Sequence, residues 1–118
     1  MANSMGYHEP LEKISSKTQD IHRALVSVQE ELEAVDWYRQ RADACGDEEL
    51  RGILLHNAHE EVEHAAMLLE WLRRRDESFA EQLSTYLFQD KPILEIEEAE
   101  EGGAGDSGAG MTVGSMKE

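Results

Sequence analysis

The chain has 118 residues, which is enough for one domain, and its 26 acidic against 11 basic residues give a formal charge of −15. This charge argues against nucleic acid and anionic membrane surfaces as partners, because both attract Lys and Arg, and it favours cations such as metal ions. No segment reaches the roughly 18 consecutive apolar residues of a membrane-spanning helix, and the N-terminus has no signal-peptide pattern. Cys45 is the only cysteine, which predicts a reducing, cytoplasmic environment.

Residues 1–12 are polar and include Pro10, so we expect an irregular N-terminal arm, followed by a helical domain over residues 13–98. The first helix is predicted from mostly apolar side chains that recur at steps of four and three residues, interrupted only by Arg39. The members of this stripe are Ile14, Thr18, Ile21, Leu25, Val28, Leu32, Val35 and Ala42. Gly46 suits the C′ position of this helix, and Asp47 suits the N-cap of the next.

The second helix is predicted over about Glu48 to Arg75 and has its own apolar stripe. The members of that stripe are Leu50, Ile53, Leu54, Ala58, Ala65, Leu68 and Leu72. Because the connection between the two helices is so short, they must fold back as an antiparallel hairpin. Ser78 and Glu81 resemble a capping box that opens a short third helix, ending near Phe88. The expected fold is therefore all-α, a two-helix hairpin plus a short C-terminal helix.

The C-terminal part of the sequence changes in character after Pro92, which ends the region of the third helix. Glu95 to Glu101 form either a final helical turn or a solvated segment. Residues 99–110 are acidic and then Gly-rich, which is typical of a flexible linker. Residues 111–118 form a short, partly apolar end segment.

Two polar residues interrupt the apolar stripe of the second helix. Glu61 and His64 occupy inward positions between Ala58 and Leu68, and their spacing of three places them on one face. A Glu-x-x-His pair of this kind lets one helix supply both a carboxylate and an imidazole to the same metal cluster. Each residue alone is more typical of a solvated carboxylate or a hydrogen-bonded core histidine, but the pair predicts a metal site.

The first helix supplies a matching carboxylate, Glu31, whose neighbours Ser27 and Ala34 are small and leave space around it. A dinuclear site in a four-helix bundle needs a Glu from each of two helices and a Glu-x-x-His pair from each of the others. This chain carries one copy of each, so we expect two chains to pair into such a bundle, whose four carboxylates would balance two divalent ions. Glu30 and Glu33 lie on other faces and by themselves are typical of solvated charges.

These features together resemble the encapsulated ferritins, over about residues 8–98. The resemblance rests on the segment EELEAVDWY, residues 30–38, combined at the matching separation with the Glu-x-x-His segment. Members of that family are two-helix half-ferritins, which form a ferroxidase centre at a two-fold dimer interface and assemble into decameric rings. The resemblance implies that Glu31, Glu61 and His64 bind iron, as two Fe²⁺/Fe³⁺ ions per dimer interface, and that Tyr38 lies beside this catalytic centre.

The resemblance also implies a second metal site, on the route by which iron arrives. Glu30 and Glu33 would hold a cation there, and Ca²⁺ or Zn²⁺ also suits this acidic pair. His56 would belong to an outer part of the route. Trp37 would lie near the iron path, although a packing aromatic explains this residue at least as well.

The end segment resembles the targeting peptides that dock cargo proteins to the inner wall of encapsulin shells. Met111, Val113 and Met116 would anchor it, and Gly114 would provide a turn. This resemblance implies an encapsulin shell protein as partner and a location inside an encapsulin nanocompartment in the cytoplasm. The alternative interpretation is a disordered end without a role.

The resulting hypothesis is a ferroxidase that oxidises Fe²⁺ for mineral storage inside such a compartment. A rubrerythrin-like di-iron peroxidase is a second hypothesis, disfavoured because the chain has no Cys-rich electron-transfer module. A third is a non-catalytic helical adaptor, whose dimer is stabilised by Zn²⁺ or Ca²⁺.

Overall fold

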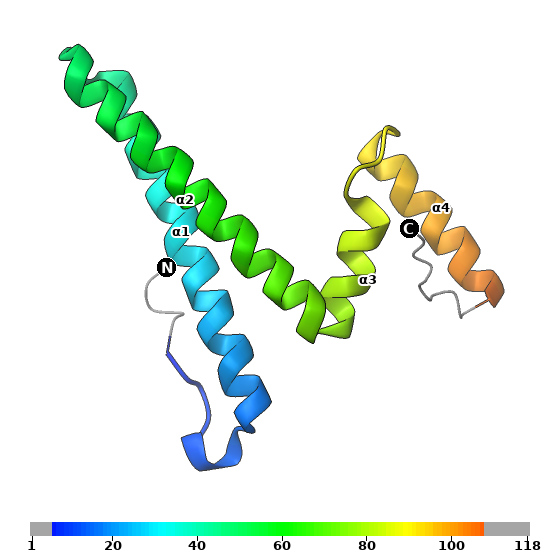
Figure 1. The fold of residues 1–118 in the computed structure, drawn as a ribbon. Coiled ribbons are helices and arrows are strands. Elements are labelled where there is room, and N and C mark those ends of the chain that lie inside the picture. The colour runs from blue at the N-terminus through cyan, green and yellow to red at the C-terminus, as the bar shows by residue number, and fades with distance from the viewer. Residues whose placement is uncertain (1–5, 108–118) are drawn as a thin grey trace. The chain divides into compact units, whose positions relative to one another are not determined.

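The computed structural model describes residues 6–107, and the side chains of residues 6–102 (Figure 1). Every regular element in this part of the chain is helical, so the predicted all-α class is confirmed. The elements are a 3-10 helix at Leu11–Lys13 and the helices α1 (Ser16–Ala44), α2 (Glu48–Arg75), α3 (Glu77–Tyr86) and α4 (Ile93–Ser107). The chain divides into two compact units, one that ends at Trp71 and one that begins at Leu72.

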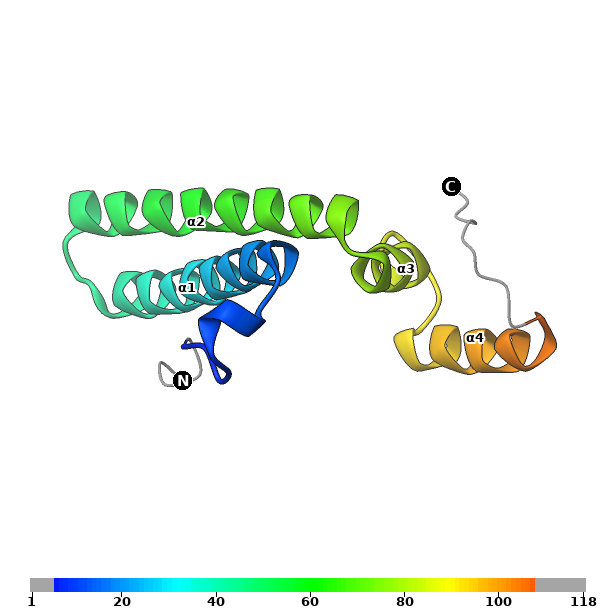
Figure 2. The same ribbon diagram turned by 90° about the horizontal axis from the view of Figure 1, so that it is seen from below.

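Helices α1 and α2 run side by side in opposite directions and form the predicted hairpin (Figures 1 and 2). The N-terminus of α1 is capped by Ser15, whose Oγ accepts a hydrogen bond from the backbone N–H of Thr18 at 3.1 Å. Asp47 caps α2 in the same way, because its Oδ2 accepts from the backbone N–H of Leu50 at 2.8 Å. The predicted N-cap at Asp47 is therefore confirmed.

The turn between these helices differs from the expected one. The C-cap of α1 is Cys45, which has extended backbone angles (φ −87°, ψ 127°). Gly46 does not adopt the left-handed conformation that is typical of a C′ glycine. The chain leaves α1 through an extended residue, which needs no glycine.

The hairpin buries a row of small side chains between its two helices. Ala24, Val28 and Ala42 of α1 are buried, as are Ala58 and Ala65 of α2. Side chains of this size let the two helix backbones approach closely. Of the predicted stripe on α1, Val28 and Ala42 are confirmed as core.

Several larger members of the predicted stripes on α1 and α2 are exposed in the single chain. Leu32 is 54% exposed, and Leu25, Leu50 and Ile53 are also exposed. A two-helix hairpin has only one contact surface, so it covers one narrow face of each helix and leaves the neighbouring apolar face uncovered. Exposed apolar surface on this scale marks an interaction site more often than a free surface. No helix in the described part is long and apolar enough to span a membrane.

Helix α3 begins earlier than the sequence predicts. Asp76 is its N-cap and accepts a hydrogen bond from the backbone N–H of Phe79 at 2.9 Å. The predicted capping box of Ser78 and Glu81 is therefore wrong. Asp76 has the extended backbone of an N-cap residue and the helix begins at Glu77, so Ser78 lies inside the first turn. The helix ends at Tyr86, and Phe88 follows with a left-handed backbone (φ 61°) and a 99% exposed side chain.

Helix α4 is longer than either alternative for the acidic segment. It begins at Ile93, and the carbonyl of the preceding Pro92 accepts hydrogen bonds from the backbone N–H groups of Glu95 and Ile96 at 3.0 and 3.2 Å. Pro suits this position because its missing N–H has no helical partner to lose. The helix runs to Ser107, so the part of the predicted linker before that residue is helical, while residues 108–110 lie outside the described chain.

Candidate metal centre

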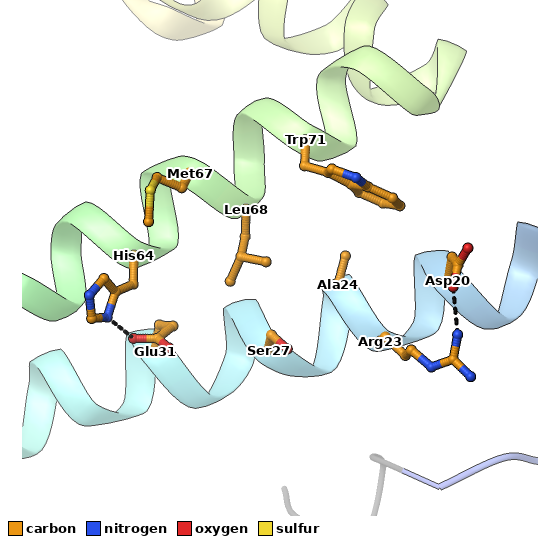
Figure 3. A pocket seen from close by; sticks show the side chains of 9 residues that line it. All are labelled: Asp20, Arg23, Ala24, Ser27, Glu31, His64, Met67, Leu68 and Trp71. Atoms are coloured by element: carbon orange, nitrogen blue, oxygen red, sulfur yellow. Dashed lines mark hydrogen bonds and ion pairs between the residues drawn. The ribbon is translucent and has the colours of Figure 1, made fainter.

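Three predicted ligands come together inside the hairpin. Glu61 and His64 lie one turn apart on α2, and the antiparallel arrangement brings Glu31 of α1 opposite them. The Nδ1 atom of His64 lies 3.3 Å from Oε1 of Glu31 and 3.4 Å from Oε1 of Glu61. Figure 3 shows the imidazole of His64 directed at Glu31 across the gap between the helices. One potential ligand atom from each residue lies within 4.8 Å of the other two, which is close enough to share an ion.

The electrostatics of Glu31 are unfavourable without a cation. Its pKa is raised above the ordinary value of 4.5, first by a side-chain hydrogen bond with Glu61, then by burial and by repulsion from the same carboxylate. His64 opposes this increase in the pKa but does not cancel it. A cation beside Glu31 would lower this pKa and offset the repulsion between the two carboxylates.

One carboxylate oxygen of the cluster lacks a hydrogen-bond partner. Oε1 of Glu31 is buried and has no hydrogen-bond partner among the described residues. Buried polar atoms are almost always satisfied, so an orphan beside a second carboxylate and an imidazole calls for a positive ion. Carboxylate oxygen and imidazole nitrogen are suitable donors for iron, so these residues fit the predicted metal.

His64 is the neutral ligand of the set. Desolvation is the largest influence on its pKa and lowers it, but Glu31 and Glu61 together raise the pKa above its ordinary value of 6.5. Without metal, the imidazole therefore retains its proton more readily than a free histidine. A bound metal ion must displace that proton.

A comparison with known proteins identifies the group to which this cluster belongs. The sequence profile of the EncFtn-like family matches residues 6–90, which contain all three candidate ligands. The chain belongs to the EncFtn-like family. Its curated relatives include the "Encapsulated ferritin-like protein" of Rhodospirillum rubrum, 58% identical over 93% of this chain and 81% of that protein. The "Ferritin-like protein" of Thermotoga maritima is 53% identical over 91% of this chain and 94% of that protein.

A solved structure supports the fold of this EncFtn-like chain. The crystal structure of a protein from Nitrosomonas europaea is 59% identical and superposes with a TM-score of 0.72. The superposed region covers 75% of this chain and 97% of the Nitrosomonas europaea chain.

Other predicted residues of this EncFtn-like chain lie outside the three-residue cluster. Tyr38 is half-buried, and the guanidinium of Arg41 lies 5.5 Å from the centre of its ring. The same guanidinium lies 6.0 Å from the ring of Trp37. Glu30 is exposed and Glu33 is half-buried. Within residues 6–102, no second group of three possible metal ligands gathers, so a site at Glu30 and Glu33 remains a prediction that needs ligands from elsewhere.

His56 lies on the outer side of α2, where its Nε2 is 3.8 Å from Oε2 of Glu60. The other oxygen of Glu60 is 3.9 Å from Nε2 of His64. Glu60 was not among the predicted site residues, although residues 56, 60 and 64 are spaced by four and therefore share a helix face. The predicted targeting residues Met111, Val113, Gly114 and Met116 lie beyond the part of the chain that the structure describes.

An open groove of about 590 Å³ leads along the hairpin away from the cluster (Figure 3). Glu31 and His64 form one end of it, and Asp20 and Arg23, which are ion-paired, form the other. Between these ends lie small or apolar side chains, namely Ala24, Ser27, Met67, Leu68 and Trp71. The candidate ligands therefore face open space on one side instead of a closed core.

Proposed function

We propose that this EncFtn-like protein is a ferroxidase, in which Glu31, Glu61 and His64 of two chains bind a pair of Fe²⁺ ions. The observation that supports this most directly is the buried, unsatisfied Oε1 of Glu31, which faces a second carboxylate and Nδ1 of an imidazole. Iron is the substrate of this reaction. Each Fe²⁺ loses one electron, and dioxygen accepts the electrons together with protons, so neither cysteine nor an organic cofactor is needed.

Pairing of two chains follows from the ligand count and from the exposed apolar surface. One hairpin offers two carboxylates and one imidazole, which leaves an ion with open coordination positions. A second hairpin would double the set to four carboxylates and two imidazoles, balancing two divalent ions. It would also cover Leu25, Leu32 and Met67, which are exposed in a single chain. The dimer would be a ferritin-like four-helix bundle, able to assemble further into a ring of ten chains.

The ligands would have distinct roles in this centre. Glu31 and Glu61 would bind and bridge the ions, because their repulsion disappears once a cation separates them. His64 would hold one iron through Nδ1, the nitrogen that faces both carboxylates. Tyr38, seven residues from Glu31 on the same face of α1, would lie beside the centre. Glu30 and Glu33 would attract iron at a second site, with His56 further out.

The proposed cellular role is iron storage within an encapsulin compartment. The Rhodospirillum rubrum relative is named an encapsulated ferritin-like protein, and it matches 93% of this chain. Residues 99–110 would connect the helical domain over residues 13–98 to the targeting peptide, residues 111–118. A shell protein that binds this peptide would keep the ferroxidase where the oxidised iron is stored.

Aerobic addition of Fe²⁺ tests the proposal. The wild-type protein should oxidise Fe²⁺ rapidly with matching consumption of oxygen, measured by absorbance and an oxygen electrode. Glu31→Ala, Glu61→Ala and His64→Ala should each abolish most of this activity, and their effects should not add because they act on one cluster. Glu33→Ala should do less, altering uptake more than chemistry.

The same measurement separates the alternatives. Iron binding without oxidation would support the non-catalytic adaptor, and turnover with hydrogen peroxide but not with dioxygen would support the peroxidase. Wild-type rates in Glu61→Ala would mean that the assigned centre is wrong.

A further inference from the structure

We propose that Glu60 is a positioning residue of the metal centre, whose carboxylate binds Nε2 of His64 so that Nδ1 is directed at the metal. This inference rests on the proposed metal-binding role of Glu31, Glu61 and His64. It adds a fourth residue of the same chain, which acts through His64 and does not itself touch the metal.

The orientation of the His64 ring is the first step. Its Nδ1 faces Oε1 of Glu31 at 3.3 Å and Oε1 of Glu61 at 3.4 Å. Nε2 lies on the opposite edge of the ring, and its neighbouring carboxylate oxygen is Oε1 of Glu60 at 3.9 Å. The imidazole is thus flanked by carboxylates on both edges, with two on the metal side and one behind.

Glu60 is itself held in place from its other side. Its Oε2 lies 3.8 Å from Nε2 of His56, one helical turn before it. Each oxygen of this carboxylate therefore faces a different imidazole along the ridge 56, 60 and 64 of α2. These separations are longer than a hydrogen bond, and a shift of about 1 Å would bring each oxygen of Glu60 within hydrogen-bond distance of its imidazole.

The chemistry of histidine ligands explains why such a contact matters. When Nδ1 binds a metal ion, the proton of the neutral ring resides on Nε2, which then donates a hydrogen bond. Metal-bound histidines generally donate this N–H to a carboxylate or carbonyl, which fixes the tautomer and the ring orientation. Loss of such a partner typically lowers metal affinity by about 10- to 100-fold. Glu60 is in the right place to be this partner, because the ring's other edge is already committed to Glu31 and Glu61.

The test uses Co²⁺, which binds oxygen and nitrogen ligands similar to those of Fe²⁺. Binding of Co²⁺ can be measured without the oxidation reaction proposed for Fe²⁺, and its visible absorption reports its coordination. Glu60→Ala should weaken Co²⁺ binding by about 10- to 100-fold and alter the absorption bands, because the ring of His64 loses its fixed orientation. Glu60→Gln retains an oxygen that accepts from Nε2–H, so it should restore the spectrum and much of the affinity. Circular dichroism should show unchanged helix content, since both replacements suit a half-buried helical position.

Glu63→Gln is the matched control. Glu63 is exposed on the same turn, and its replacement removes the same charge without touching Nε2 of His64. A change in Co²⁺ affinity and spectrum in Glu60→Ala that is absent from Glu63→Gln supports the positioning role. An unchanged spectrum in Glu60→Ala, or equal losses in Glu60→Ala and Glu63→Gln, would overturn it. Because the readout is Co²⁺ coordination, failure of Fe²⁺ oxidation in the wild-type protein would refute the ferroxidase proposal and leave this result intact.

Discussion

His64 on α2 and Glu31 on α1 face each other across the hairpin, with Nδ1 of the one 3.3 Å from Oε1 of the other. This contact connects the metal cluster to the packing of the two helices, because neither helix alone carries all three candidate ligands. The helices must be in register for the cluster to exist. Substitutions that shift α1 against α2 should therefore affect metal binding as well as stability.

The pH dependence of the metal-free protein follows from the raised pKa values of Glu31 and His64. A group with a raised pKa in the folded state stabilises the fold below its unfolded pKa and loses this contribution as pH rises through the folded value. For Glu31 the loss begins above about 4.5, and for His64 above about 6.5. With a chelator present, the melting temperature should therefore decrease as pH rises above about 4.5, and further above about 6.5, because both folded-state pKa values are raised above these ordinary values.

The metal-bound protein should show the opposite trend. Its ligands bind only after losing their protons, so metal affinity should rise over the same pH interval. Thermal melts at matched pH values, with chelator or with Zn²⁺, measure both trends. In Glu31→Gln the lower part of the metal-free pH dependence should disappear. A melting temperature that rises with pH in the presence of chelator would contradict the assigned shifts.

Metal should drive association, because in the proposed dimer each chain would contribute half of the ligands. Light scattering under anaerobic conditions should show a shift toward dimers or larger assemblies when Fe²⁺ is added. Leu32→Glu places a charge on an exposed apolar position of α1 and should shift the equilibrium toward monomers. Ala44→Glu adds the same charge at the exposed end of α1 and should have little effect. A monomer that binds two irons tightly would exclude the shared site.

The start of α3 can be tested by removing its cap. Asp76→Ala should destabilise α3 by about 1 kcal/mol, because the backbone N–H of Phe79 loses its acceptor. Ser78 lies two residues after Asp76, inside the first turn of α3. Ser78→Ala should change stability by a few tenths of a kcal/mol at most, since alanine is favoured inside a helix. Amide hydrogen exchange in α3 measures both effects locally. Equal losses of protection in the two variants would favour the capping box at Ser78 instead.

The proposed targeting peptide should be separable from the proposed iron oxidation. Removal of Met111–Glu118 should leave iron oxidation and assembly unchanged, because all proposed ligands lie on the hairpin. The truncated chain should nevertheless fail to be packaged when it is co-expressed with its cognate shell protein. Fusion of residues 102–118 to a fluorescent protein should load that protein into the shell, with retention strengthened when many tails bind at once. Normal packaging of the truncated chain would remove the cargo part of the proposal.

Much of the hairpin could be predicted because its signals are local. Helical periodicity, the cap at Asp47 and the spacing of Glu61 and His64 depend on neighbours in sequence. The packing face could not be predicted as well, because apolar residues cover more of each helix than a single chain can bury. Leu25 belongs to the apolar stripe predicted for the first helix, whereas the smaller Ala24 beside it is the residue that the hairpin buries. Periodicity identifies the apolar faces of a helix but does not identify which of them the hairpin covers.

The C-terminal elements and Glu60 were missed for different reasons. α4 extends to Ser107 because hydrogen bonding can continue into glycine residues whose low helical propensity predicts a break. Glu60 lies four residues from both His56 and His64, but carboxylates at such a spacing are common on helices, so the spacing alone is a weak signal. Only the direction of the His64 ring, which no sequence pattern specifies, distinguishes Glu60 from the other glutamates around it.

The short connection between α1 and α2, residues 45–47, has a consequence for the order of events after synthesis. A hairpin of two helices is dominated by contacts close in sequence, and such topologies fold in microseconds to milliseconds. Three candidate ligands would therefore be in place on a single chain long before a second chain arrives. The encounter of two chains, at a typical rate constant of about 10⁵–10⁷ M⁻¹s⁻¹, would then limit how fast the complete centre forms. At low expression, a newly made chain would spend most of its early life folded and unable to oxidise iron.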